Sequence, residues 1–124
     1  MAKFVNDIVM DDGLNNLKAG VNRVAIATAA IVAYADVATN AVGTCVKATG
    51  DFTVANGDGG GRKVTCTAAT IVVGTAGNVT HVAYYGTTGS GTVWAVATCA
   101  PTAVSVSGTA IVAALDITEI GDVA

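Results

Sequence analysis

The hydrophobic positions at the start of the chain recur at helical spacing. They form one approximate stripe along a helix that is predicted from Asn6 to Ala19. Asn6 is a suitable N-cap, and Lys18 followed by Gly20 is typical of the end of a helix. The pattern predicts one amphipathic helix that depends on docking for its stability, because Gly13 weakens it. The stripe consists of Phe4, Ile8, Leu14 and Leu17.

From Val21 onward the pattern changes to short runs rich in valine, isoleucine and threonine, separated by glycines. β-Branched residues favour extended backbone, and in several runs the apolar positions alternate with polar ones, which is the period of a strand. The sequence therefore predicts about eight or nine short strands. They cover residues 21–28, 44–48, 51–55, 62–68, 71–73, 79–85, 92–99, 103–106 and 109–117.

Glycine and proline positions predict how these strands are connected. Segments 74–78 and 86–91 carry glycines between strand patterns, so both are predicted to be hairpin connections. Pro101 cannot donate a hydrogen bond to a sheet and is predicted to end the strand before it. The apolar segment 29–43 is predicted to be a long surface loop with a short helical turn near 36–40, available for contacts.

Together these elements predict a mainly β fold, a compact jelly-roll-like β-sandwich of about eight short antiparallel strands with one N-terminal α-helix. The 124 residues suit a single domain, with an arm and helix in 1–20 and the sandwich in 21–124. Segment 93–99 is apolar on both faces. It is predicted either to be a central strand covered twice, for example by the N-terminal helix, or to meet a neighbouring subunit.

The composition changes this picture by indicating a partner. Hydrophobic residues make up 52% of the chain, whereas charged residues make up 12%, about half the usual quarter. The apolar content comes from small side chains, since 24 alanines and 20 valines accompany 5% aromatic residues. A surface with so few charges is poorly suited to water alone, so a large part of it is predicted to face another protein.

Charge and hydropathy set aside several classes of function. The net charge is −3, and the longest basic cluster is Arg62-Lys63, so nucleic-acid binding is not expected. The longest nearly apolar run covers residues 24–35, which is shorter than the about 20 residues of a membrane helix, so no membrane partner is expected. Acidic residues at 7, 11 and 12 occupy the place of a signal peptide's apolar core, so no signal peptide is predicted.

Cysteine and histidine are too few to predict a site. Cys45, Cys66 and Cys99 are widely spaced and His81 is the single imidazole, so no zinc site is predicted. The thiols are predicted to be reduced and partly buried, with a Cys66–Cys99 disulfide left open if their strands are neighbours. His81 has no triad signature around it, so the chain is predicted not to be an enzyme and to use no cofactor.

The glycine-rich segment 56–63 is predicted to be a flexible connection. A phosphate-binding loop follows a strand and opens a helix, whereas this segment leads into a strand pattern at Lys63. It also carries a single carboxylate, Asp58, among its glycines, unlike the alternating acidic residues of a calcium loop. The segment is therefore expected to hold neither a phosphate nor a calcium ion.

The order of several short motifs resembles that of small structural proteins in the heads of tailed bacteriophages and prophages. The motifs extend over nearly the whole chain. They are residues 4–11 with 14–18, then Gly60 to Thr65, Thr80 to Ala83, Val96 to Cys99 and Ala114 to Ile117. The resemblance implies a virion protein that is made in the host cytoplasm and placed on the capsid surface. Its implied role is that of a decoration, or cement, protein that bridges major capsid subunits and stabilises the shell.

The implied partners are the major capsid protein and further copies of the chain, with trimers expected by analogy and monomers and dimers left open. Two other functions also remain open, a low-copy head–tail, tail or fibre component and a small carbohydrate-binding module. Core packing is the alternative role for each aromatic candidate. The candidate contact residues are Phe4, Ile8, Leu14 and Leu17 near the N-terminus, Ile31 and Tyr34 in the loop, and Tyr84, Tyr85 and Trp94 as aromatic anchors.

Overall fold

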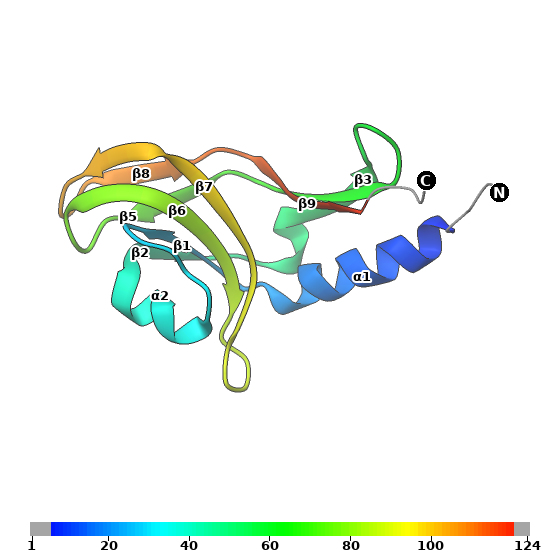
Figure 1. Ribbon diagram of the computed structural model, residues 1–124, viewed down its shortest axis with the longest axis horizontal. Coiled ribbons are helices and arrows are strands. Elements are labelled where there is room, and N and C mark those ends of the chain that lie inside the picture. The colour runs from blue at the N-terminus through cyan, green and yellow to red at the C-terminus, as the bar shows by residue number, and fades with distance from the viewer. Residues whose placement is uncertain (1–5, 121–124) are drawn as a thin grey trace.

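The computed structural model describes residues 6–120, which contain nine strands and two α-helices (Figure 1). The predicted fold class is confirmed, because the chain is mainly β, its paired strands are antiparallel and α1 lies at the N-terminus. The elements are α1 (Asp7–Gly20), β1 (Arg23–Ala27), α2 (Tyr34–Asn40), β2 (Ala41–Val46), the 3₁₀ turn Thr49–Asp51, β3 (Phe52–Asn56), β4 (Arg62–Cys66), β5 (Ala69–Val72), β6 (Gly77–Gly86), β7 (Thr92–Val104), β8 (Thr109–Val112) and β9 (Leu115–Ile120).

Helix α1 begins at the predicted N-cap, Asn6, and its last residue is Gly20, with Val21 as the C-cap. The Ile8 backbone N–H donates to Asn6 Oδ1 at 2.9 Å, and the Val21 N–H donates to the Leu17 carbonyl at 2.9 Å. The buried face differs from the predicted stripe, because it consists of Met10, Leu14 and Leu17 while Ile8 is 67% exposed. The reason is angular: Ile8 lies two positions before Met10, which turns it about 200° around the helix axis.

A four-stranded antiparallel sheet in the order β2-β1-β6-β7 organises the fold. Its second strand, β1, alternates strictly, with Val24 and Ile26 on one face and Ala25 and Ala27 on the other, and all four are buried. Both faces of this sheet are therefore covered. Helix α2 packs on one face and β5 packs on the other, whereas β3 and β4 pack against α1 (Figure 1).

The main core lies between the four-stranded sheet and two smaller sheets, β3-β4-β9 and β5-β8. Its largest fully buried side chains include Tyr84, Phe52 and Ile71, and α1 adds Leu14 to the same cluster. Strands β2 and β5 approach closely at Gly43, where a Cβ atom would lie 2.7 Å from the Cγ2 of Ile71. The small residue at this point allows the two sheets to pack directly.

Segment 29–43, predicted to be a surface loop with a helical turn, contains the longer helix α2 and a buried residue, Ile31. The carboxylate of Asp36 accepts hydrogen bonds from the backbone N–H groups of Val32 and Ala33, both at 2.9 Å, which holds the chain in position to begin the helix. These two bonds lower the pKa of Asp36. Ile31 and Val37 then cover the alanines of the four-stranded sheet.

Two predicted connections have different outcomes. Segment 86–91 joins the paired strands β6 and β7, so the predicted hairpin is confirmed. The hairpin predicted at 74–78 is wrong, because β5 pairs with β8 whereas β6 belongs to the four-stranded sheet. Glycines at the ends of a loop thus indicated a turn correctly but could not indicate which strands pair.

The strand end predicted at Pro101 is also wrong, because β7 continues through it to Val104. The register moves from His81↔Thr98 to Val79↔Thr102, so three residues of β7 bulge opposite Thr80. A proline is tolerated there because β7 is an edge strand and a bulge needs no ladder hydrogen bond from it. The alternative that β7 is central and covered twice is wrong for the same reason.

Helix α1 packs against the core through one face. Truncating a side chain on this face is therefore predicted to lower stability more than truncating a side chain of similar size on the exposed face. Leu14→Ala removes a side chain that is 2% exposed and is expected to lower the free energy of unfolding by about 3 kcal/mol. The matched control Ile8→Ala, on the exposed face, is expected to change it by less than about 0.5 kcal/mol. Denaturant titrations followed by far-UV circular dichroism measure both, and equal effects would contradict this packing of α1.

The buried phenol of Tyr84 predicts a loss of stability in alkaline solution. Burial raises the pKa of Tyr84 to about 12, whereas an unfolded tyrosine ionises near about 10. Because the pKa is raised in the folded protein, the contribution of Tyr84 to the free energy of unfolding is complete below about pH 10. This contribution is lost as the pH rises from about 10 to 12. Denaturant titrations across this range are expected to show that loss, and Tyr84→Phe is expected to show a shallower one. An identical pH dependence in the two proteins would contradict the burial of the phenol.

Candidate functional site

The groups that could support catalysis lie apart. His81 is half-buried on β6, and its Nδ1 lies 2.7 Å from the hydroxyl of the preceding residue, Thr80. Over residues 6–120, no group of three histidine, cysteine, aspartate or glutamate side chains is placed to hold a metal ion. The geometry around His81 is thus a local hydrogen bond within one strand.

The three cysteines are free thiols, and the structure does not form the Cys66–Cys99 disulfide that the sequence left open. Cys66 lies on β4 and Cys99 on β7, in different sheets, so their strands are not neighbours. Burial raises the pKa of the Cys66 and Cys45 thiols. Cys99 is exposed, and its thiol donates to the Val79 carbonyl over 3.6 Å.

A buried lysine is a feature that the sequence analysis missed. Lys47 is 7% exposed, and its ammonium group donates to the Thr67 carbonyl at 3.2 Å, the Thr67 hydroxyl at 3.1 Å and the Ala68 carbonyl at 2.8 Å. These three bonds use all three donors of the ammonium group, so Lys47 holds the β4–β5 connection against the residue that follows β2. A single lysine inside an apolar run gives no sequence signal of this kind.

The glycine-rich segment is a closed β3–β4 connection. The Gly57 N–H donates to the Gly61 carbonyl at 2.9 Å, and Lys63 Nζ lies 2.7 Å from a carboxylate oxygen of Asp58. Next to it, the guanidinium of Arg62 forms an ion pair of 2.7 Å with Asp11 on α1, which raises the pKa of Arg62. The segment thus joins β3 to β4 and helps to dock the helix.

The structure divides the predicted contact residues into two groups and leaves Phe4 outside the described residues. Core residues are covered by the chain's own side chains and serve its folding. Exposed candidates lie on α1, α2 and β7 and remain accessible to a partner. The buried group is Leu14, Leu17, Ile31, Tyr84 and Tyr85, and the exposed group is Ile8, Tyr34 and Trp94.

The two exposed aromatic residues rest on glycines. Trp94 lies over Gly20 at the end of α1, where an added Cβ atom would collide with the indole ring. Tyr34 packs in the same way on Gly91, and its ring centroid lies 6.0 Å from that of Tyr85. Both side chains are therefore held in place while 37–39% of their surface remains exposed.

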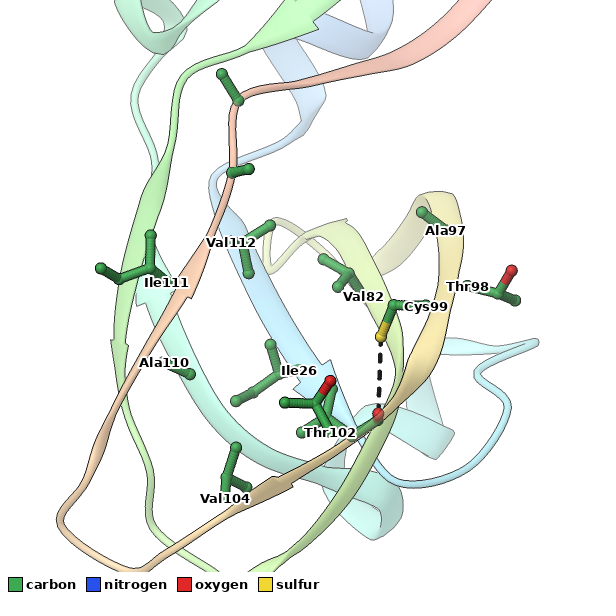
Figure 2. A pocket seen from close by; sticks show the side chains of 13 residues that line it. Ile26, Val82, Ala97, Thr98, Cys99, Thr102, Val104, Ala110, Ile111 and Val112 are labelled. Atoms are coloured by element: carbon green, nitrogen blue, oxygen red, sulfur yellow. Dashed lines mark hydrogen bonds between the residues drawn. The ribbon is translucent and has the colours of Figure 1, made fainter.

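An apolar groove of about 320 Å³ lies between β7 and β8 (Figure 2). These strands follow one another in the chain, but β7 pairs with β6 and β8 pairs with β5, so they diverge. The lining, as far as the structure describes it, contains no charged side chain. It includes Ile26 and Val82 from the main core, Cys99 and Val104 from β7, and Val112 from β8.

The outer face of the β5–β8 sheet continues this apolar surface beyond the groove. The register pairs Thr70 with Ile111 and Val72 with Thr109, and these four side chains point away from the core. Val72 is 67% exposed and Ile111, which also lines the groove, is 74% exposed. Exposed branched side chains therefore lie directly beside the apolar groove and form an uncharged surface with it.

No family model, curated protein or solved structure matches this chain. Among the described helices, none is long and apolar enough to cross a membrane. The observations that bear on function are therefore the uncharged groove, the exposed face of β5–β8 and the sequence motifs described above.

The different burial of the three thiols predicts their order of reaction with an aromatic disulfide reagent. Exposed Cys99 is expected to react first, half-buried Cys45 more slowly, and buried Cys66 at the rate at which the protein unfolds. Absorbance stopped-flow measurements resolve these phases. Cys99→Ser is expected to remove the fast phase alone, and a fast phase that persists in this variant would contradict the assignment.

Proposed function

We propose that this chain is a non-enzymatic virion structural protein, a decoration or cement protein that binds the outside of a tailed-phage head. The observation that supports this role best is the uncharged surface formed by the groove and the β5–β8 outer face. Such a surface gains from burial against an apolar patch of another protein and offers little attraction for a charged ligand. The partner in this proposal is the major capsid protein, as the sequence motifs imply.

The distribution of exposed apolar side chains fits a protein that bridges two subunits. Ile8 and Val9 are 67% and 65% exposed on the first turn of α1, which projects from one end of the molecule (Figure 1). The β5–β8 face lies at the opposite end. Two apolar contacts at opposite ends can hold neighbouring capsid subunits together, which is how a cement protein stiffens a shell.

Modest individual contacts are sufficient for this role. An ordinary protein interface buries about 800 Å² on each partner. Repetition over an icosahedral shell multiplies such contacts, because each bound copy restrains subunits that other copies also restrain. The surface therefore has no need of a strong charged anchor.

The proposal predicts that a charge on the β5–β8 outer face weakens binding to the shell. Heads of the encoding phage, prepared without this protein, are mixed with purified chain, and the bound fraction is measured by sedimentation. Ile111→Lys and Val72→Lys are each expected to weaken binding at least about tenfold, because a lysine placed against an apolar patch must lose its hydration. Val46→Lys, at another exposed valine on β2, is the matched control.

Melting temperatures of all three variants separate loss of binding from loss of fold, since each substitution replaces an exposed side chain. Wild-type protein that fails to bind the heads would contradict the decoration role. Binding that is equally strong in Ile111→Lys, Val72→Lys and Val46→Lys would place the contact elsewhere and contradict the assigned surface.

A further inference from the structure

A second hollow in the surface, of about 340 Å³, lies where the end of α1, the β6–β7 hairpin and the start of β7 come together. We call it the Trp94 cleft. It is separate from the groove, because its β7 residues are Thr92 and Trp94 whereas those of the groove begin at Ala97. Its volume lies near the lower end of the about 300–1,000 Å³ of small-molecule sites.

The strand register places a bulge at the tryptophan of this cleft. Tyr84 pairs with Ala95, and the next residue of β6, Tyr85, pairs with Val93. Trp94 is therefore an extra residue on β7, with no partner on β6. Bulges re-aim a side chain and are over-represented next to active sites. Here the re-aimed indole lines the cleft, and 39% of Trp94 remains exposed.

Two glycines let the three segments meet around the indole. A Cβ atom on Gly20 would collide with the ring of Trp94, and one on Gly86 would collide with the Gly20 carbonyl oxygen. The close approach of α1, the end of β6 and the tryptophan therefore requires residues without side chains. The indole rests on backbone along its Nε1, Cε2 and Cζ2 atoms, so its position is fixed.

Hydrogen bonds fasten the walls of the cleft to each other. Asn22, which follows α1, donates from Nδ2 to the Thr87 hydroxyl at 3.0 Å and accepts from the Thr87 N–H at 3.2 Å. The Asn22 N–H donates to the Tyr85 carbonyl at 3.1 Å. Further along the hairpin, Tyr34 packs on Gly91. The cleft is thus formed in the free protein, so a ligand loses little affinity to the ordering of the chain.

The polar groups of the cleft are neutral and unused. They are the amide of Asn16 and the hydroxyls of Thr88 and Thr92, and within the described part of the chain these side chains make no hydrogen bond. Such groups can both donate and accept. No charged side chain is among the described residues that line the cleft, and the net charge of −3 gives no attraction for an anion.

We propose that the Trp94 cleft binds one neutral sugar ring of a glycan. A pyranose has an apolar C–H face that can stack on an indole, and its hydroxyls both donate and accept hydrogen bonds. The cleft offers a fixed indole beside one amide and two hydroxyls, which matches both properties. A nucleobase can also stack on an indole, but the phosphates of a nucleic acid would meet an uncharged cleft on an acidic protein.

This site does not depend on the proposed function, because its residues are distinct from Val72 and Ile111 on the β5–β8 face. Figure 1 shows the β6–β7 hairpin at the far end of β7 from β8. Sugar binding by a chain that fails to bind heads would overturn the capsid role alone. Head binding by a chain that binds no sugar would overturn the sugar site alone.

The first test uses the fluorescence of Trp94, which is the single tryptophan of the chain and so reports on this cleft alone. Cellobiose, lactose and N,N′-diacetylchitobiose are each titrated into the full chain. At least one of them is expected to change the fluorescence saturably, with a millimolar dissociation constant, because one ring makes few contacts. Sorbitol, which has the hydroxyls but no ring, is the solute control, and uridine is the heterocyclic competitor.

The second test compares variants that keep the tryptophan. Asn16→Ala and Thr88→Ala each remove a hydrogen-bonding group from an exposed position and are expected to raise the dissociation constant about threefold to tenfold. The matched control is Asn15→Ala, at the neighbouring exposed position of α1 that does not line the cleft. It is expected to bind like the wild-type chain. Far-UV circular dichroism checks that all three variants are folded.

The outcomes separate the sugar site from its alternatives. Saturable binding of a disaccharide that is weakened by Asn16→Ala and Thr88→Ala, and not by Asn15→Ala, supports it. The site is overturned if none of the three disaccharides binds, if sorbitol gives the same change, or if Asn15→Ala weakens binding as much as Asn16→Ala. Tighter binding of uridine than of every disaccharide would assign the cleft to a heterocycle and overturn the sugar assignment.

Discussion

The burial of both faces of the four-stranded sheet is the constraint on which the rest of this structure depends. β1 supplies Val24 and Ile26 to the main core and Ala25 and Ala27 to the cluster beneath α2, so no residue in its centre can be polar. Small residues on one face let α2 lie close to the sheet, and Gly43 on the other lets β5 approach β2. The small and branched side chains of β1 are therefore a requirement of packing.

The same constraint explains where the apolar surface comes from. β6 and β7 continue the doubly covered sheet, but the covering elements do not reach its last strand fully, so Trp94 and Val96 remain 39% and 40% exposed. The divergence of β7 from β8 then opens the groove onto core residues such as Val82. Incomplete cover of this sheet thus leaves an uncharged groove beside its last strand, next to the exposed face of the separate β5–β8 sheet.

Local signals in the sequence predicted the elements well and their pairing poorly. The cap at Asn6 and the alternation around Val24 were sufficient to locate α1 and β1, because both depend on neighbouring residues. Pro101 is tolerated within β7 because β7 is an edge strand, and segment 74–78 is not a hairpin because β5 pairs with β8. Both depend on strand pairing between residues far apart in the sequence, which local patterns do not show. Among the site residues, exposure of Trp94 and burial of Tyr84 could not be separated from sequence, because both belong to apolar strands. The groove had no local signal, since it arises where consecutive strands pair with different neighbours.

The proposed role in a virion is tested most directly by the number of copies per particle. Quantitative mass spectrometry of purified particles gives the molar ratio of this chain to the major capsid protein. A decoration protein that repeats with the shell is expected at a ratio near one or at a simple fraction of it, because icosahedral symmetry offers equivalent sites in fixed proportion. A handful of copies per particle, or none, would contradict the account.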